Sequence, residues 1–133
     1  MNPEARGRPA ALLVTHGALG KELLHTVETI LGSQTDVLTL SNEGRSAEAL
    51  TEAIESGVRS VAGAAAVVVF TDLAAGSCGI AARRIRVEGR AVLCVSGVNL
   101  PMLLEFFHYR DTLPLDDLLA RIEMKGKAGI VIQ

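Results

Sequence analysis

The sequence predicts an α/β fold, with one doubly wound, mainly parallel sheet and helices on both of its faces. Short apolar runs alternate along the chain with longer segments whose apolar residues recur at helical spacing, which is typical of parallel sheets. Residues 65–70 are apolar on both faces, as a central strand requires. The apolar content is aliphatic, since hydrophobic residues make up 49% of the chain and aromatic residues only 3%.

The expected elements follow from these patterns and from the turn residues between them. Strands are predicted at residues 10–14, 36–40, 65–70, 91–95 and 128–132. Helices are predicted at 18–31, from a cap at Ser46 to about 61, at 77–87, after a cap at Asn99, and after Pro114. In the flavodoxin-like order the strands run 2-1-3-4, with the fifth at an edge.

Length and composition predict one domain. The 133 residues suit a single core, which we place at residues 10–133 behind a flexible polar lead-in at residues 1–9. The net charge of −2 and the few aromatic residues argue against a nucleic-acid partner. We expect no membrane insertion, because the sequence contains no apolar run of about 20 residues. Cys78 and Cys94 form no metal-ligand pattern and are expected as free thiols of a cytoplasmic protein.

Two loops carry the candidate chemistry. His16 follows the first predicted strand, and Asp72 follows the third. If these strands are neighbours, their carboxyl ends meet at the switch point where open α/β sheets bind ligands. A carboxylate that accepts from one imidazole nitrogen fixes the tautomer and leaves the other nitrogen as a nucleophile. His16 and Asp72 are therefore the candidate catalytic pair for phosphoryl transfer.

The residues beside this pair suggest where a phosphoryl group would be held. Gly76 and Ser77 begin a helix, so main-chain amides and a hydroxyl would contact the phosphoryl oxygens. Gly17, before the first helix, is the third candidate for binding the phosphoryl group. We expect neither a metal nor a cofactor, because the donor would be another phosphohistidine rather than a nucleotide.

Each of these residues also has an ordinary structural interpretation. Alone, His16 would be a polar residue at a strand end, Asp72 a turn former, and Gly76-Ser77 a helix start. Their joint occurrence in two loops at one switch point favours the functional interpretation. His25 and His108 are expected on the surface. Arg83, Arg84 and Arg86 form a basic cluster, which is expected to be either a solvated helix face or a docking surface for an acidic partner.

Three segments resemble the IIA domain of the mannose-family sugar phosphotransferase system (PTS), and their order and spacing match that domain over about residues 10–133, nearly the whole chain. They are LVTHGALGKELL at 13–24, VVFTDLAAGS at 68–77 and SGVNLPMLLE at 96–105. The resemblance implies that His16 accepts a phosphoryl group from the phosphocarrier HPr and passes it to a separate IIB protein. It also implies a phosphohistidine carrier in carbohydrate transport, an association with a membrane IIC/IID complex, and a homodimer formed with the help of an antiparallel last strand.

The second segment departs from the family pattern, and two alternatives to transport remain open. Ala75, Cys78 and Ile80 stand where the family commonly has Gly, Pro and Asn. One alternative is a stand-alone regulatory PTS protein, in which phosphorylation of His16 controls a partner without sugar transport. The other is a flavodoxin-like binding module without phosphotransfer, which fits less well because Thr-His-Gly replaces a Ser/Thr-rich phosphate loop.

Overall fold

The chain forms a four-stranded parallel sheet in the order β2-β1-β3-β4, as the sequence predicts. The structure, a computed structural model, describes residues 7–61, 63–64 and 66–133. Its strands are β1 (Ala10–Thr15), β2 (Val37–Ser41), β3 (Ala66–Thr71) and β4 (Ala91–Ser96). Residues 1–6 of the expected lead-in, and residue 65 of the expected third strand, lie outside the described residues.

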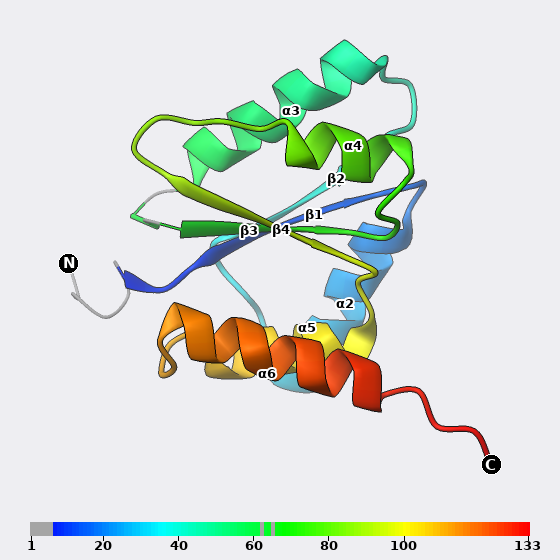
Figure 1. The fold of residues 1–133 in the computed structure, drawn as a ribbon, viewed down its shortest axis with the longest axis vertical. Helices are drawn as coiled ribbons and strands as arrows, with labels where there is room; N and C mark the ends of the chain where they lie inside the picture. Colours follow the sequence, from blue (N-terminus) through cyan, green and yellow to red (C-terminus); the bar gives the residue numbers. More distant parts are fainter. Residues whose placement is uncertain (1–6, 62, 65) are drawn as a thin grey trace.

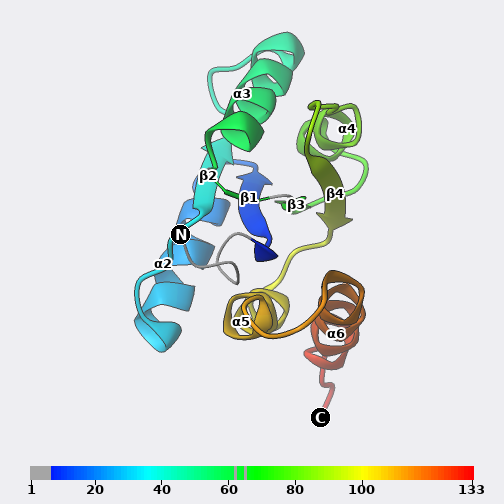
Figure 2. The ribbon, with the colours of Figure 1, turned by 90° about the vertical axis from the view of Figure 1, so that its left-hand side faces the viewer.

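Helices cover both faces of the sheet (Figures 1 and 2). On one face lie α3 (Ala47–Ser60) and α4 (Ser77–Arg83). On the other face lie α2 (Leu19–Leu31), α5 (Leu100–Tyr109) and α6 (Leu115–Ala128). Within the described residues, no helix has the length and apolar character needed to cross a bilayer.

The two central strands are buried on both sides, and their side chains alternate between two cores. Leu12 and Val69 point into the core beneath α3 and α4. Leu13 and Phe70 point into the core beneath α2, α5 and α6, where Phe70 meets Phe106 edge to face with ring centroids 5.1 Å apart. This alternation explains the continuous apolar runs, because a strand covered on both sides has no polar face.

The caps predicted for two helices are confirmed. The Ser46 side chain accepts from the main-chain N–H of Ala49 at the start of α3, and Asn99 accepts from that of Met102 at the start of α5. The extent predicted for the third helix is wrong, because α4 ends at Arg83 instead of residue 87. The chain tightens there into three-residue turns, as the N–H of Ile85 bonds to the carbonyl of Ala82.

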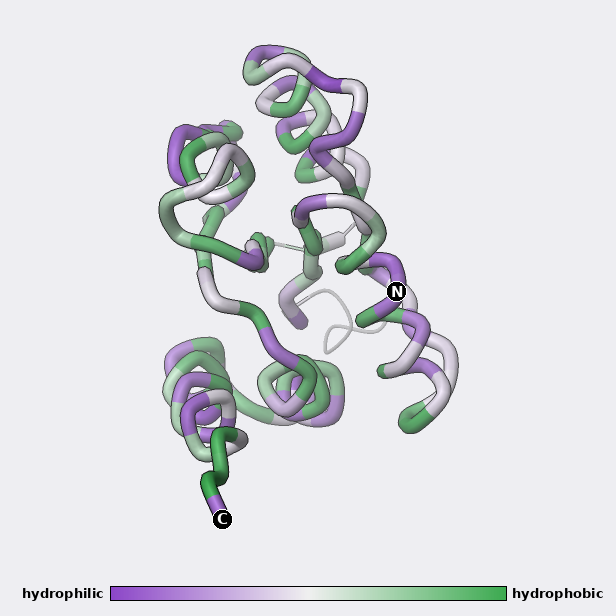
Figure 3. The backbone as a smooth tube through the Cα atoms, turned by 90° about the vertical axis from the view of Figure 1, so that its right-hand side faces the viewer, coloured by the Kyte–Doolittle hydropathy of each residue, from purple (hydrophilic) through white to green (hydrophobic). Residues whose placement is uncertain are grey.

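The predicted last strand at residues 128–132 is also wrong within this chain. Helix α6 continues through Ala128, and the tail that follows forms no strand. Figure 3 shows this tail as a hydrophobic segment that leads away from the body. Ile130, Val131 and Ile132 are 74%, 68% and 94% exposed. A strand needs a hydrogen-bonding neighbour as well as β-branched residues, and the described part of the chain offers this tail none.

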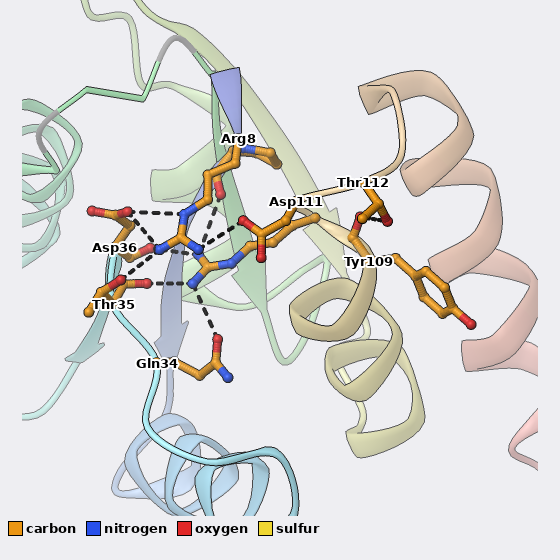
Figure 4. Close-up of polar contacts among 9 residues, drawn as sticks. Arg8, Gln34, Thr35, Asp36, Tyr109, Asp111 and Thr112 are labelled. Carbon is orange, nitrogen blue, oxygen red and sulfur yellow. Dashed lines mark hydrogen bonds and ion pairs between the residues drawn. The ribbon is translucent and has the colours of Figure 1, made fainter. Parts of the chain in front are cut away.

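A polar network joins the amino-terminal ends of β1 and β2 to the end of α5 (Figure 4). The Arg8 guanidinium donates to Asp36 at 2.9 Å and to Asp111 at 2.9 Å, so Arg8 already belongs to the packed domain although it lies in the expected lead-in. Arg110, only 2% exposed, donates to the carbonyls of Thr35 at 2.6 Å and Asp36 at 3.3 Å and to the Gln34 side chain at 3.3 Å. These bonds hold Asp36 in a left-handed conformation, with φ of 54°.

We predict that Arg110→Met destabilises the fold by about 2–4 kcal/mol, because it removes a buried donor from its bonds to the part-buried carbonyl oxygens of Thr35 and Asp36. Urea unfolding measures the loss. Arg84→Met is the matched control, since Arg84 is exposed at the end of α4, and it should change stability by less than about 0.5 kcal/mol. Equal stability of the two variants would contradict this role for Arg110.

Candidate functional site

His16 lies where β1 ends, in a turn that leads into α2. The Thr15 hydroxyl below it is buried and accepts from the main-chain N–H of Gly20 at 2.7 Å. Gly17 has φ of 57°, which favours glycine, and its N–H donates to the Asn42 side chain at 3.2 Å. The N–H of Asn42 in turn bonds to the carbonyl of Thr15 at 3.2 Å. The turn that presents His16 is thus fixed from two sides.

Asp72 lies at the end of β3, and the structure brings it to His16 as the sequence predicts. Strands β1 and β3 pair directly, with Val14 opposite Thr71, so the residues that follow each strand meet at one edge. One oxygen of Asp72, Oδ2, accepts from the main-chain N–H of His16 at 2.9 Å and lies 2.9 Å from the ring atom Nδ1. An ionised carboxylate only accepts, so Nδ1 carries the proton that faces it, and in a neutral ring the free lone pair then lies on Nε2.

Hydrogen bonds keep Asp72 ionised. Burial opposes ionisation, because the Asp72 side chain is only 12% exposed. The hydrogen bonds from the main chain and ring of His16, with that from the N–H of Leu73, outweigh burial and lower the pKa of Asp72 below its usual value of 3.8. A permanent negative charge therefore faces the imidazole at neutral pH, which stabilises any positive charge that develops on the ring.

The other edge of the imidazole faces the start of α4 and remains open to solvent. The Ser77 hydroxyl lies 3.5 Å from Nε2, and the His16 side chain is 40% exposed. A Cβ added at Gly76 would lie 2.9 Å from the ring atom Cε1. Glycine at this position thus lets the loop approach the ring. The structure brings Gly76 and Ser77 to Nε2, whereas the N–H of Gly17 is already bonded to Asn42.

The loop between Asp72 and α4 is held by two residues that the sequence analysis did not assign to the site. Arg83 donates to the carbonyl of Ala74. Gly79 packs against the same loop, because a Cβ there would lie 2.4 Å from the carbonyl oxygens of Leu73 and Ala74. Gly79 lies three positions after Gly76, the residue that caps α4, and this spacing of two glycines around a helix start was the available signal.

The three departures from the family pattern have different places in the loop. Ala75 does not require left-handed backbone, since Asp36 is the sole non-glycine residue with positive φ in the described part of the chain. Ile80 is 39% exposed on α4. Cys78 is fully buried beneath the site. His25 and His108 are exposed, as predicted, and lie on α2 and α5.

The fold and the His16–Asp72 pair define a class of α/β proteins in which a histidine and a carboxylate meet at the switch point. Within that class, comparisons with known proteins identify the family. The family model EIIA-man, described as "PTS system fructose IIA component", matches residues 10–123. The chain belongs to this family of PTS IIA components.

Individual relatives agree with this assignment. The chain is 33% identical over 123 residues to the PTS system mannose-specific EIIAB component of Escherichia coli K12, and the match covers 91% of this chain but 38% of that protein. A crystal structure of the phosphotransferase system component EIIA from Streptococcus agalactiae superimposes with a TM-score of 0.83 at 25% identity, covering 92% and 95% of the two chains. The crystal structure of a putative phosphoenolpyruvate-dependent sugar PTS permease from Klebsiella pneumoniae superimposes with a TM-score of 0.81 at 26% sequence identity. This match covers 95% of this chain and 92% of that chain.

We predict that Gly79→Ala displaces the loop that carries Asp72, because the added methyl group meets two carbonyl oxygens that cannot move without the loop. The expected cost is about 1–3 kcal/mol of unfolding free energy, together with shifted amide NMR signals of His16 and Asp72. Gly7→Ala is the matched control, since nothing lies within 4 Å of its added Cβ. Unchanged signals in Gly79→Ala would show that the loop does not depend on this contact.

Proposed function

We propose that this chain is a phosphocarrier IIA protein of a phosphoenolpyruvate-dependent sugar phosphotransferase system. In the proposal, His16 accepts a phosphoryl group from phospho-HPr and passes it to a IIB protein. The observation that carries the proposal is the pair of contacts from Asp72 Oδ2 to the main chain and ring of His16. In a neutral ring this pair places the proton on Nδ1, so that Nε2 offers the lone pair that a phosphoryl acceptor requires.

The chemical step needs only this chain's imidazole and the donor. The lone pair of Nε2 attacks phosphorus, a new N–P bond forms, and the N–P bond of the donor histidine breaks as its electron pair returns to the donor ring. Asp72 stabilises the charge on the His16 ring through Nδ1–H. Ser77 lies near enough to Nε2 to donate to a phosphoryl oxygen. Gly76 leaves room beside the ring, and Gly17 would contact the group only by exchanging its bond to Asn42.

The test is labelling with enzyme I, HPr and radiolabelled phosphoenolpyruvate. We predict acid-labile label on the wild type and none on His16→Ala, because Nε2 of His16 is the acceptor. His25→Ala is the matched control and should be labelled like the wild type, since His25 is an exposed residue of α2. An unlabelled wild type, in a reaction where HPr itself is labelled, would overturn the proposal.

A second step of this assay separates transport from the regulatory alternative. Adding a IIB protein of the mannose family should remove the label from His16 within the time of one enzymatic turnover. Label that remains on the chain in the presence of IIB would instead favour a stand-alone regulatory protein. The match covers only 38% of the length of the curated relatives, so their activity and partners enter only as proposals. A cytoplasmic location beside a membrane IIC/IID complex is part of the same proposal.

The apolar tail supports a further part of the proposal, a homodimer. A groove of about 620 Å³ lies between β4 and α6, lined by apolar side chains such as Leu93, Val95, Met102 and Ile122, and Ile130 at the start of the tail reaches its rim. Strand β4 pairs only with β3 in the described sheet, so its other edge is open. We propose that the tail of one copy covers the groove of a second copy, burying side chains that are otherwise exposed.

We predict that the double variant Ile130→Glu/Ile132→Glu is monomeric, because it places charges in the apolar contact. Sedimentation velocity at about 100 μM should show a dimer for the wild type and a monomer for the variant. Ile30→Glu is the matched control and should remain dimeric, since Ile30 is 55% exposed on α2, away from the groove. A monomeric wild type, or a dimeric double variant, would contradict this arrangement.

A further inference from the structure

Three side chains with different metal-binding atoms converge at the His16 site. His16, Asp72 and Cys78 each offer one ligand atom, and these atoms all lie within 4.8 Å of one another. They come from the end of β1, the end of β3 and the first turn of α4. Cys78 lies beneath the two partly exposed residues and contributes nothing to the phosphoryl transfer described above.

The chemistry of the cluster selects a class of cation. Imidazole nitrogen, carboxylate oxygen and thiolate sulfur are ligands of Zn²⁺, with bonds of about 2.0–2.3 Å, whereas Mg²⁺ and Ca²⁺ prefer oxygen alone. Ligand atoms around a tetrahedral zinc ion lie about 3.3–3.8 Å apart. The cluster would therefore contract by about 1 Å at its widest. His16 and Asp72 are the partly exposed members of the cluster, so their side chains would make this movement, and water would take the fourth position.

We propose that His16, Asp72 and Cys78 bind a thiophilic divalent cation such as Zn²⁺, and that the bound cation prevents His16 from accepting a phosphoryl group. The binding stands on the geometry of the three residues alone. The effect of the cation on phosphoryl acceptance rests, in addition, on the proposed phosphocarrier function. Binding exchanges the thiol proton of Cys78 for the cation and releases that proton to solvent.

The exclusion follows from the tautomers of imidazole. A neutral ring has one lone pair and one N–H. A cation at Nε2 takes the lone pair that would attack phosphorus. A cation at Nδ1 replaces the Nδ1–H that now faces Asp72, and the ring proton then lies on Nε2, which loses its nucleophilic lone pair. Either mode of coordination blocks phosphoryl acceptance, so a bound cation would inhibit the phosphorylation of His16.

Co²⁺ tests the binding, because a Co²⁺–thiolate bond gives a near-ultraviolet charge-transfer band that nitrogen and oxygen ligands do not give. We predict that the wild type develops this band with one equivalent of Co²⁺ and loses it when Zn²⁺ is added. Cys78→Ala should show no band, and His16→Ala should bind Co²⁺ at least about tenfold more weakly, since one of three ligands is gone. Cys94→Ala is the matched control and should keep the band, because Cys94 is the exposed cysteine on β4.

Each alternative result overturns the binding. These results are no band in the wild type, a band that persists in Cys78→Ala, and a band lost from Cys94→Ala. Thermal unfolding of Cys78→Ala checks that a lost band does not come from a lost fold. If this variant is unfolded, Cys78→Ser replaces it, since it keeps the size of the side chain without the sulfur.

The inhibition by the cation is tested with isolated phospho-HPr as the donor. For each protein, the label acquired with Zn²⁺ is compared with the label acquired without it. Zn²⁺ should lower the label on the wild type and on Cys94→Ala at least about tenfold, and on Cys78→Ala by less than about twofold. Equal inhibition of the wild type and both variants, or no inhibition of a wild type that binds Zn²⁺, would overturn the proposed inhibition. A wild type that takes no label without Zn²⁺ overturns the phosphocarrier proposal, and the Co²⁺ result then still decides the metal site.

Discussion

The site depends on one shared acceptor, the Oδ2 atom of Asp72. It bonds to the main chain of His16 and to the ring of the same residue, both at 2.9 Å. The first contact fixes where the β1 turn lies, and the second fixes the tautomer and the ring plane. Both require that β1 and β3 be neighbours, because one intervening strand would separate the two loops by about 4.8 Å more. Sheet order is therefore a condition of the chemistry.

Sequence reasoning found His16 and Asp72 because their signal is local. Each follows an apolar run, and the rule that ligands bind at the switch point then joins the two loops. The contacts of Asn42 and Arg83 were not predictable in this way. They depend on turn geometry and on the path of a side chain back to a main-chain carbonyl, neither of which has a periodic pattern. Residue type identified the candidate histidine and its carboxylate partner, but not the groups that position them.

The error at the last predicted strand has a different cause. The β-branched tail has a strand-like composition, but strand formation also depends on a partner edge, which composition does not reveal. The opposite end of the sheet shows the same dependence on non-local contacts. There Arg110 is buried, and its pKa is lowered to about 10, by burial first and then by the neighbouring Arg8, while Asp111 and Asp36 oppose the shift. No local pattern distinguishes this arginine from the exposed ones.

The polar network and the candidate site thus lie at opposite ends of the same strands. The amino-terminal ends are tied by the Arg8 and Arg110 network, whereas at the carboxyl-terminal ends His16 keeps one edge of its ring open to solvent. An open ring edge beside an ionised carboxylate is a nucleophile for phosphorus and equally a ligand for a cation. The family commonly has proline at position 78, and a proline side chain offers no ligand atom. Cys78 places a sulfur atom, a soft ligand, near both His16 and Asp72. The competition that we propose between phosphoryl group and metal follows from that single residue, because one imidazole lone pair serves only one of them.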